Sequence, residues 1–163
     1  TEDHPGTKYL HKDGKFTRGK GLFKAISYTH PVEEPDQAYP LVLTTGRNLY
    51  QYHTRTMTSK VEGLTAKAGE SYVEIGPVTA AQYGVGHGDM VRVSSPRGAI
   101  EVQARVLPRV RDGLIFVPFH YGEAGANILT AANLDPVCRI PEFKVLKARI
   151  EKLSDAGPGA QAF

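Results

Sequence analysis

The sequence predicts a mainly β protein, in which a closed β-barrel with a few short helices follows an extended N-terminal arm. Between residues 39 and 153 there are about six short apolar or alternating segments, which is the pattern of strands. The 17 glycines and 11 prolines supply the turns that many short strands need. Because no long helical pattern separates these segments, a barrel is favoured over an α/β sheet.

Residues 1–38 are expected to form a basic arm and linker. From residue 8 to residue 24 there are six basic side chains against the single acid Asp13, with glycines between them. This stretch is either a solvated arm or a surface whose cations meet an acidic partner or a phosphate. Residues 22–26 are expected to form a short strand, and residues 31–35 read as a linker.

The barrel is expected to cover residues 39–153, and residues 154–163 to form a flexible tail. Its first strand is the apolar run 41–43, which ends in the turn-like residues 44–46. The remaining strands are predicted, in chain order, at residues 71–75, 90–93, 99–106, 114–117 and 145–153. A hairpin turn at residues 96–98 joins two of them. Pro77 predicts a short helix over residues 78–83, and Gly84 ends it.

Composition excludes several classes of function. The formal net charge of +3 is by itself too small for a nucleic-acid-binding footprint, which leaves only a local basic patch as an alternative, and no nucleic-acid partner is expected. The single cysteine, Cys138, excludes an internal disulfide and a self-contained Cys-rich metal site. No apolar run is long enough to span a membrane, and no signal peptide is visible, so a cytoplasmic protein is expected. Because the chain opens on Thr1, we expect a processed chain or a piece of a larger one.

The familiar catalytic motifs are absent. There is no HExxH, GxSxG, Walker A or GxGxxG sequence. The glycine-rich residues 85–89 precede a strand, so they form either a tight turn or, as the alternative, a phosphate-binding loop. Arg139 beside Cys138 would favour a thiolate, yet a lone cysteine is expected to be a small buried hydrophobe. We expect no catalytic residue and no metal ligand in this chain.

Three polar loops that adjoin predicted strands carry the case for ligand binding. Residues 45–58 contain a glycine, two arginines, a histidine, two tyrosines and several hydroxyl groups. These side chains either stay in solvent or surround a phosphate or a flat polar ring. Residues 119–127 follow a buried strand and include Asn127, whose amide is both donor and acceptor. Residues 141–144 precede the last strand, so all three loops are expected at the rim of the barrel.

These segments resemble a known family. The series YPLVLTTGR (39–47), YHTRTMT (52–58) and GDMVRVSSPRG (88–98) is similar to the C-terminal domain of the bis-pterin molybdenum/tungsten oxidoreductases. Residues 119–127, NLDP (133–136) and PEFK (141–144) look most like the large (alpha) subunit of formate dehydrogenase. Residues 2–7 also resemble the segment that leads into that domain. The resemblance covers nearly the whole chain.

The resemblance implies a double-psi β-barrel that caps molybdopterin guanine dinucleotide, present as a bis-dinucleotide with Mo or W in the intact enzyme and not required for the barrel to fold. The cofactor-binding residues that it implies are Thr45, Gly46, Arg47, Gln51, His53, Thr54, Arg55, Phe119, His120, Asn127, Phe143 and Lys144. Arg55 departs from the family pattern, because many relatives carry a small residue there, usually glycine. The metal ligand, the catalytic residues and the iron–sulfur cysteines would belong to other domains.

Three functions follow as hypotheses. The first is the cofactor-binding C-terminal domain of a formate dehydrogenase large subunit, whose partners are the remaining domains and the iron–sulfur subunits. The intact enzyme would oxidise formate to carbon dioxide. The second is a free-standing subunit that supplies the same barrel, as in formylmethanofuran dehydrogenase. The third is a non-catalytic interaction barrel that makes contact through its basic arm.

Overall fold

The computed structural model describes residues 2–3, 6, 8–16 and 18–153, and the predicted tail 154–163 lies outside the described residues. The chain divides between His30 and Pro31 into an N-terminal unit and a barrel unit. Residues 31–38, which the sequence pattern groups with the arm, therefore belong to the unit that contains the barrel.

The described part of the N-terminal unit contains one turn of 3-10 helix, η1 (Lys12–Gly14), and an isolated bridge between Phe16 and Gly19. The prediction of a strand at residues 22–26 is wrong, since this stretch has no regular structure. A strand needs a partner for its backbone groups, and no ladder forms here. Phe23 and Ile26 accordingly stay exposed.

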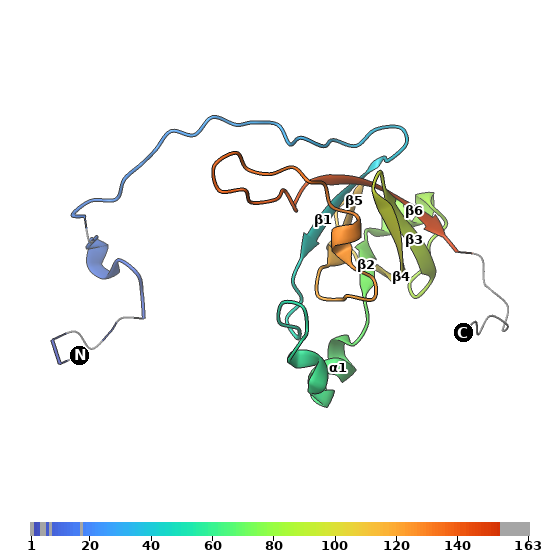
Figure 1. Ribbon diagram of the computed structural model, residues 1–163, viewed down its shortest axis with the longest axis horizontal. Coiled ribbons are helices and arrows are strands. Elements are labelled where there is room, and N and C mark those ends of the chain that lie inside the picture. The colour runs from blue at the N-terminus through green and yellow to red at the C-terminus, as the bar shows by residue number, and fades with distance from the viewer. Residues whose placement is uncertain (1, 4–5, 7, 17, 154–163) are drawn as a thin grey trace. The chain divides into compact units, whose positions relative to one another are not determined.

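The described part of the barrel unit, residues 31–153, contains six strands with short helices between them (Figure 1). The strands are β1 (Leu41–Gly46), β2 (Tyr72–Ile75), β3 (Met90–Ser95), β4 (Gly98–Val106), β5 (Leu114–Pro118) and β6 (Leu146–Lys152). The helices are η2 (Thr58–Lys60), α1 (Glu62–Ala68), α2 (Pro77–Gln82) and η3 (Ala126–Ile128). All six predicted strands and the helix at Pro77 are present, with ends that differ by up to three residues. Helix α1 was not expected.

The sheet closes in the order β1-β5-β2-β4-β3-β6. Strand β1 is parallel to β5, and β2 is parallel to β4; the other four pairings are antiparallel. Exchanging β1, β2 and β3 with β4, β5 and β6 leaves this pairing map unchanged. Such a twofold arrangement, with each half contributing a strand parallel to one in the other half, defines a double-psi β-barrel, and it confirms the predicted fold class.

The alternating sequence pattern explains the core. Along β4, the side chains of Ile100, Val102 and Ala104 are buried, while those between them face outward. Strand β6 repeats the pattern with Leu146 and Ala148. Since successive side chains of a strand point to opposite faces, one face of every strand fills the barrel. The interior is therefore packed, and any ligand must bind at an end or on the outside.

Gly46 at the end of β1 is required by packing. A Cβ atom built on Gly46 would lie 2.6 Å from Cε2 of Phe116, on the neighbouring strand β5. The aromatic ring thus occupies the space that a side chain would need. This close approach, rather than an unusual backbone conformation, disfavours larger residues at position 46, because the Phe116 ring would have to move.

We predict that Gly46→Ala destabilises the chain by about 1–3 kcal/mol, the usual effect of overpacking. Gly63→Ala in α1 is the matched control, because nothing lies within 4 Å of the added Cβ. The control is expected to be neutral or to stabilise by up to about 1 kcal/mol. Urea denaturation of both variants checks this, and equal midpoints for the two would contradict the packing account.

Candidate functional site

Three loops meet at one end of the barrel because of strand direction. Strands β1 and β5 are parallel and end side by side at Gly46 and Pro118, whereas β6 runs antiparallel to β1 and begins there. The backbone ladder continues past the strand ends, since the Phe119 amide donates to the Gly46 carbonyl at 3.1 Å. The Thr45 amide and hydroxyl both donate to the Phe143 carbonyl, at 3.2 and 3.0 Å. We call residues 45–58, 119–127 and 141–144 the rim loops.

A cavity of about 300 Å³ lies between the rim loops. It is lined by Thr45, His53, Thr54, Phe119, Asn127 and Phe143, all of which are among the residues that the family resemblance implies. Two aromatic rings supply flat apolar surface, and the imidazole and amide supply polar groups. Asn127 is exposed, and its side-chain amide has no hydrogen-bond partner among the described residues. Such a set suits a flat polar heterocycle.

Two cations adjoin this cavity. The guanidinium carbon of Arg47 lies 5.9 Å from the centre of the Phe119 ring, which lines the cavity. The Lys144 ammonium donates to the Thr45 carbonyl at 2.5 Å, which places its positive charge at the end of β1. An ammonium has three donors, so this bond leaves donors for a ligand. Both cations are suited to an anionic group on a ring bound in the cavity.

The side chains of Gln51, in the first rim loop, and His120, in the second, are buried and do not line the cavity. The Gln51 amide donates to the Ala68 carbonyl at 2.7 Å and accepts from the Thr58 hydroxyl at 2.6 Å. His120 Nε2 accepts a hydrogen bond from the backbone amide of Asn48 at 2.9 Å. The ring proton is therefore on Nδ1, which donates to the backbone carbonyl of His53 at 2.6 Å. Both side chains are at least 95% buried. Their polar atoms hold the loop in place.

The structure adds Asn48 and Tyr121 to this network, and sequence reasoning missed both. The Asn48 side-chain oxygen accepts from the amides of Tyr50 and Gln51, which shapes the turn after β1. Its amide nitrogen donates to the Tyr121 hydroxyl at 2.9 Å, and that hydroxyl donates to the Ala68 carbonyl at 3.0 Å. Burial raises the pKa of Tyr121, so it stays a neutral donor. Asn48 comes two residues after the end of β1, and an Asn just beyond a strand is a known turn signal that could have found it.

Arg55 has a strained backbone and one unmet donor. Its φ of +64° lies in the left-handed region, as does the +44° of His53. Only glycine adopts that region freely, which is a physical reason for the glycine that the family pattern favours at position 55. The guanidinium donates to Glu123 at 2.9 Å and lies 4.6 Å from the centre of the Tyr121 ring. Its Nε is buried, and no described residue forms a hydrogen bond with it.

Arg47 also lines a second cavity of about 380 Å³ on the outer face of β2 and β4. Three more cations line it: Lys67, Arg105 and Arg109. Arg109 pairs with Glu74 at 2.6 Å, and the guanidinium carbon of Arg105 lies 3.7 Å from the centre of the Tyr72 ring. Burial raises the pKa of Tyr72, and the nearby Glu74 charge adds to this. Arg47 therefore lies between the two cavities.

Among the described residues, no group of three or more potential ligands could hold a metal ion. Within the same residues, no helix is long and apolar enough to cross a membrane. Cys138 is exposed, so the expectation that it is a buried hydrophobe is wrong. It lies in an irregular segment, where the Asp135 carboxylate accepts from the backbone amides of Val137 and Cys138.

The closed barrel and its donor-rich end define a ligand-binding domain. Residues 41–147 match the family described as "Molydopterin dinucleotide binding domain". The chain belongs to this molybdopterin dinucleotide-binding domain family.

Similar proteins agree with this assignment. The chain is 42% identical over 153 residues to the "F420-dependent formate dehydrogenase subunit alpha" of Methanocaldococcus jannaschii, covering 93% of this chain and 23% of that protein. It is 40% identical over 152 residues to the "Assimilatory nitrate reductase catalytic subunit" of Bacillus subtilis, covering 91% of this chain and 21% of that protein. The chain therefore spans less than a quarter of the length of these relatives.

A solved structure supports the fold. Acetylene hydratase from Pelobacter acetylenicus superposes with a TM-score of 0.69 at 18% identity, over 78% of this chain and 21% of that one. At this identity the likeness establishes the fold alone.

We predict that Gln51→Ala destabilises the chain by about 1–3 kcal/mol, because the Ala68 carbonyl loses one of its two donors and the Thr58 hydroxyl loses its acceptor. Asn127→Ala is the matched control and is expected to change stability by less than about 0.5 kcal/mol, since its side chain is exposed. Thermal denaturation of the two variants measures the difference. A stable Gln51→Ala chain would mean that this side chain does not hold the loop.

Proposed function

We propose that the rim loops bind molybdopterin guanine dinucleotide, and that this chain is the cofactor-binding C-terminal domain of a formate dehydrogenase large subunit. The observation that carries the proposal is the cavity between the rim loops, with Arg47 and Lys144 beside it. Its lining comes from three loops that are far apart in sequence, and it occurs in a chain that belongs to the dinucleotide-binding family.

The residues present fit such a cofactor. Phe119 and Phe143 would lie against a flat ring system, and the Asn127 amide would pair with its polar edge. Arg47 and Lys144 would neutralise the phosphates. The buried Nε of Arg55, which has no partner in the described chain, is a further donor for an anionic group.

The volume of the cavity limits how much of the cofactor this chain can bind. A cavity of about 300 Å³ is at the lower end of small-molecule sites, so it accommodates one part of a dinucleotide rather than all of it. The remainder would be bound by other parts of a longer protein. This agrees with the 23% of the M. jannaschii relative that the chain spans.

When bound, the pterin dinucleotide and its Mo or W supply the redox chemistry, while the protein binds and orients the group. In this chain, Arg47 and Lys144 would hold negative charge, and the two phenylalanines would exclude water from the ring. Gln51 and His120 would act indirectly by fixing the first rim loop. No described residue is assigned a proton transfer or a bond to the metal.

Formate is the substrate that we propose for the intact enzyme, because the 42% identical relative is named as a formate dehydrogenase subunit. The 40% identity to a nitrate reductase subunit indicates that the barrel itself does not select the substrate. The proposed partners are the remaining domains of the large subunit and its iron–sulfur subunits. A cytoplasmic location is proposed with them, and an exposed free thiol at Cys138 is compatible with a reducing compartment.

Two other functions remain as alternatives. A free-standing subunit of a related enzyme, such as formylmethanofuran dehydrogenase, would use the same rim in the same way. An interaction barrel that binds no cofactor would not need the cations of the rim.

We predict that Arg47→Ala and Lys144→Ala each weaken cofactor retention about tenfold or more in the enzyme that contains this domain, since each removes a charge-assisted contact worth about 1.5–3 kcal/mol. Arg92→Ala is the control, because Arg92 pairs with Glu101 on the outside of the barrel at 2.7 Å. Metal analysis and pterin fluorescence after gel filtration report the content of each variant. Full pterin and metal content in both rim variants would favour the interaction barrel.

A further inference from the structure

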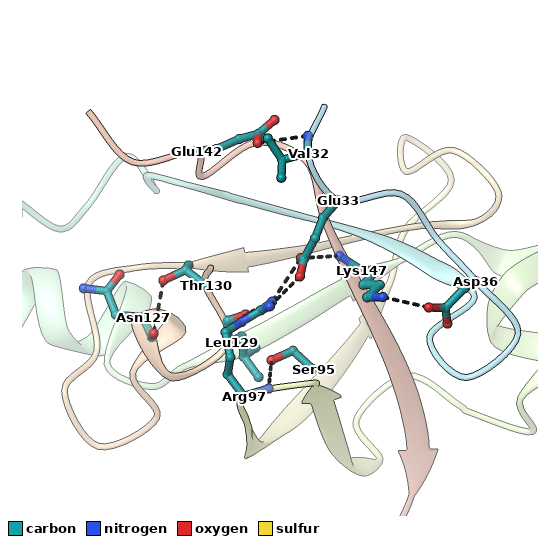
Figure 2. Close-up of polar contacts among 10 residues, drawn as sticks. All are labelled: Val32, Glu33, Asp36, Ser95, Arg97, Asn127, Leu129, Thr130, Glu142 and Lys147. Atoms are coloured by element: carbon teal, nitrogen blue, oxygen red, sulfur yellow. Dashed lines mark hydrogen bonds and ion pairs between the residues drawn. The ribbon is translucent and has the colours of Figure 1, made fainter. Parts of the chain in front are cut away.

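The linker that leads into β1 is attached to the barrel through a set of polar contacts (Figure 2). Arg97, in the turn between β3 and β4, donates to both carboxylate oxygens of Glu33 in the linker; the Nη2–Oε2 distance is 3.0 Å. Both side chains are largely buried, with 13% of Glu33 and 28% of Arg97 exposed. Two parallel bonds from a guanidinium fix orientation as well as distance.

The same guanidinium also holds the second rim loop. Its Nε and Nη2 donate to the Leu129 carbonyl at 3.1 and 2.8 Å. Leu129 is fully buried and directly follows η3, which carries Asn127. Arg97 therefore joins the linker to the loop that presents Asn127 to the cavity, and Figure 2 shows it between the two.

Close packing reinforces this contact. A Cβ built on Gly98 would lie 2.6 Å from Cγ2 of Ile128 in η3. The β3–β4 turn and η3 thus touch, and a side chain at position 98 would force Ile128 to move. The turn motif that the sequence pattern marks as a hairpin has a second role as the support of η3.

The linker also reaches the third rim loop. The Val32 amide donates to Glu142 at 3.4 Å, next to Phe143 in the chain. The Lys147 amide donates to the Glu33 carboxylate at 3.3 Å, and its ammonium donates to Asp36 at 2.7 Å. These contacts fix the start of β6 just beyond Lys144.

Glu33 remains ionised at neutral pH in this setting. Partial burial raises its pKa, but the hydrogen bonds from Arg97 and from the Lys147 amide outweigh burial, and the net effect lowers the pKa. Glu33 therefore keeps the negative charge that pairs with the Arg97 guanidinium throughout the physiological pH range.

We propose that Glu33 and Arg97 are positioning residues for the cofactor site: the linker, through them, sets the place of the rim loops that carry Asn127 and Phe143. The proposal rests on the proposed function of the rim. It assigns to the linker a part in shaping the site, although no linker residue lines the cavity.

The test compares Glu33→Gln with Glu101→Gln in the 163-residue chain by amide hydrogen exchange. Glu101 also pairs with an arginine, Arg92, but away from the rim, so it is a matched control. In Glu33→Gln an amide NH₂ replaces one oxygen that faces the guanidinium donors. The backbone amides of Ile128 and Leu129 donate hydrogen bonds around the η3 turn, and we expect them to exchange about tenfold faster or more. The exchange rates of the β2 amides should not change. The control should alter neither.

Arg97→Lys provides a second variant that keeps the charge but loses the planar fork. A lysine ammonium cannot reproduce the bonds to Glu33 and Leu129 together, so we expect the same faster exchange in η3. Exchange in η3 within twofold of the wild type, in either variant, would overturn the proposal. An equal rise in η3 and β2 would overturn it too, because that result means general destabilisation.

Cofactor content separates this proposal from the one on which it rests. If Arg47→Ala and Lys144→Ala lose the cofactor while Glu33→Gln leaves η3 exchange unchanged, the positioning role alone fails. The positioning role is supported by two results together. In Glu33→Gln the η3 amides exchange faster, and the assembled enzyme that carries Glu33→Gln loses pterin about threefold or more faster than the enzyme that carries Glu101→Gln. Faster exchange in η3 with normal pterin retention would overturn the role in cofactor binding.

Discussion

The site depends on the backbone hydrogen bonds at the end of β1. Thr45 donates twice to the Phe143 carbonyl, and the Gly46 carbonyl accepts from the Phe119 amide. These bonds extend the barrel ladder by one step beyond its strands, and they bring together three loops that are distant in sequence. Parallel pairing of β1 with β5 is what makes this possible, because it ends both strands at the same side of the barrel.

A buried polar network then gives the first rim loop its shape. The side chains of Gln51, His120 and Tyr121 form hydrogen bonds with backbone groups of the first rim loop and of α1. Buried polar groups that are fully paired specify a single arrangement, whereas unpaired ones are costly. The exposed Asn127 and the cations Arg47 and Lys144 can therefore face a ligand from a rigid support, with the linker contacts of Glu33 and Arg97 holding the opposite side.

Much of this architecture follows from the sequence, and the failures have physical causes. Alternation locates β4 and β6, because a half-buried strand must alternate. The positions of three polar loops next to predicted strands locate the rim, and the family resemblance supplies the individual cavity residues. Residues 22–26 have strand-like composition but find no pairing strand, which local sequence does not reveal. Composition also does not distinguish a polar side chain that lines the rim cavity, such as His53, from one that is buried in the polar network, such as His120. Helix α1 is missed because its seven residues are too few to show a helical period.

The most direct test of the account is a structure of the cofactor-loaded enzyme that contains this domain. The account predicts that part of the pterin dinucleotide occupies the cavity between Phe119 and Phe143, with Arg47 or Lys144 within hydrogen-bond distance of a phosphate oxygen. A dinucleotide bound away from the rim loops, with that cavity filled only by water, would contradict it.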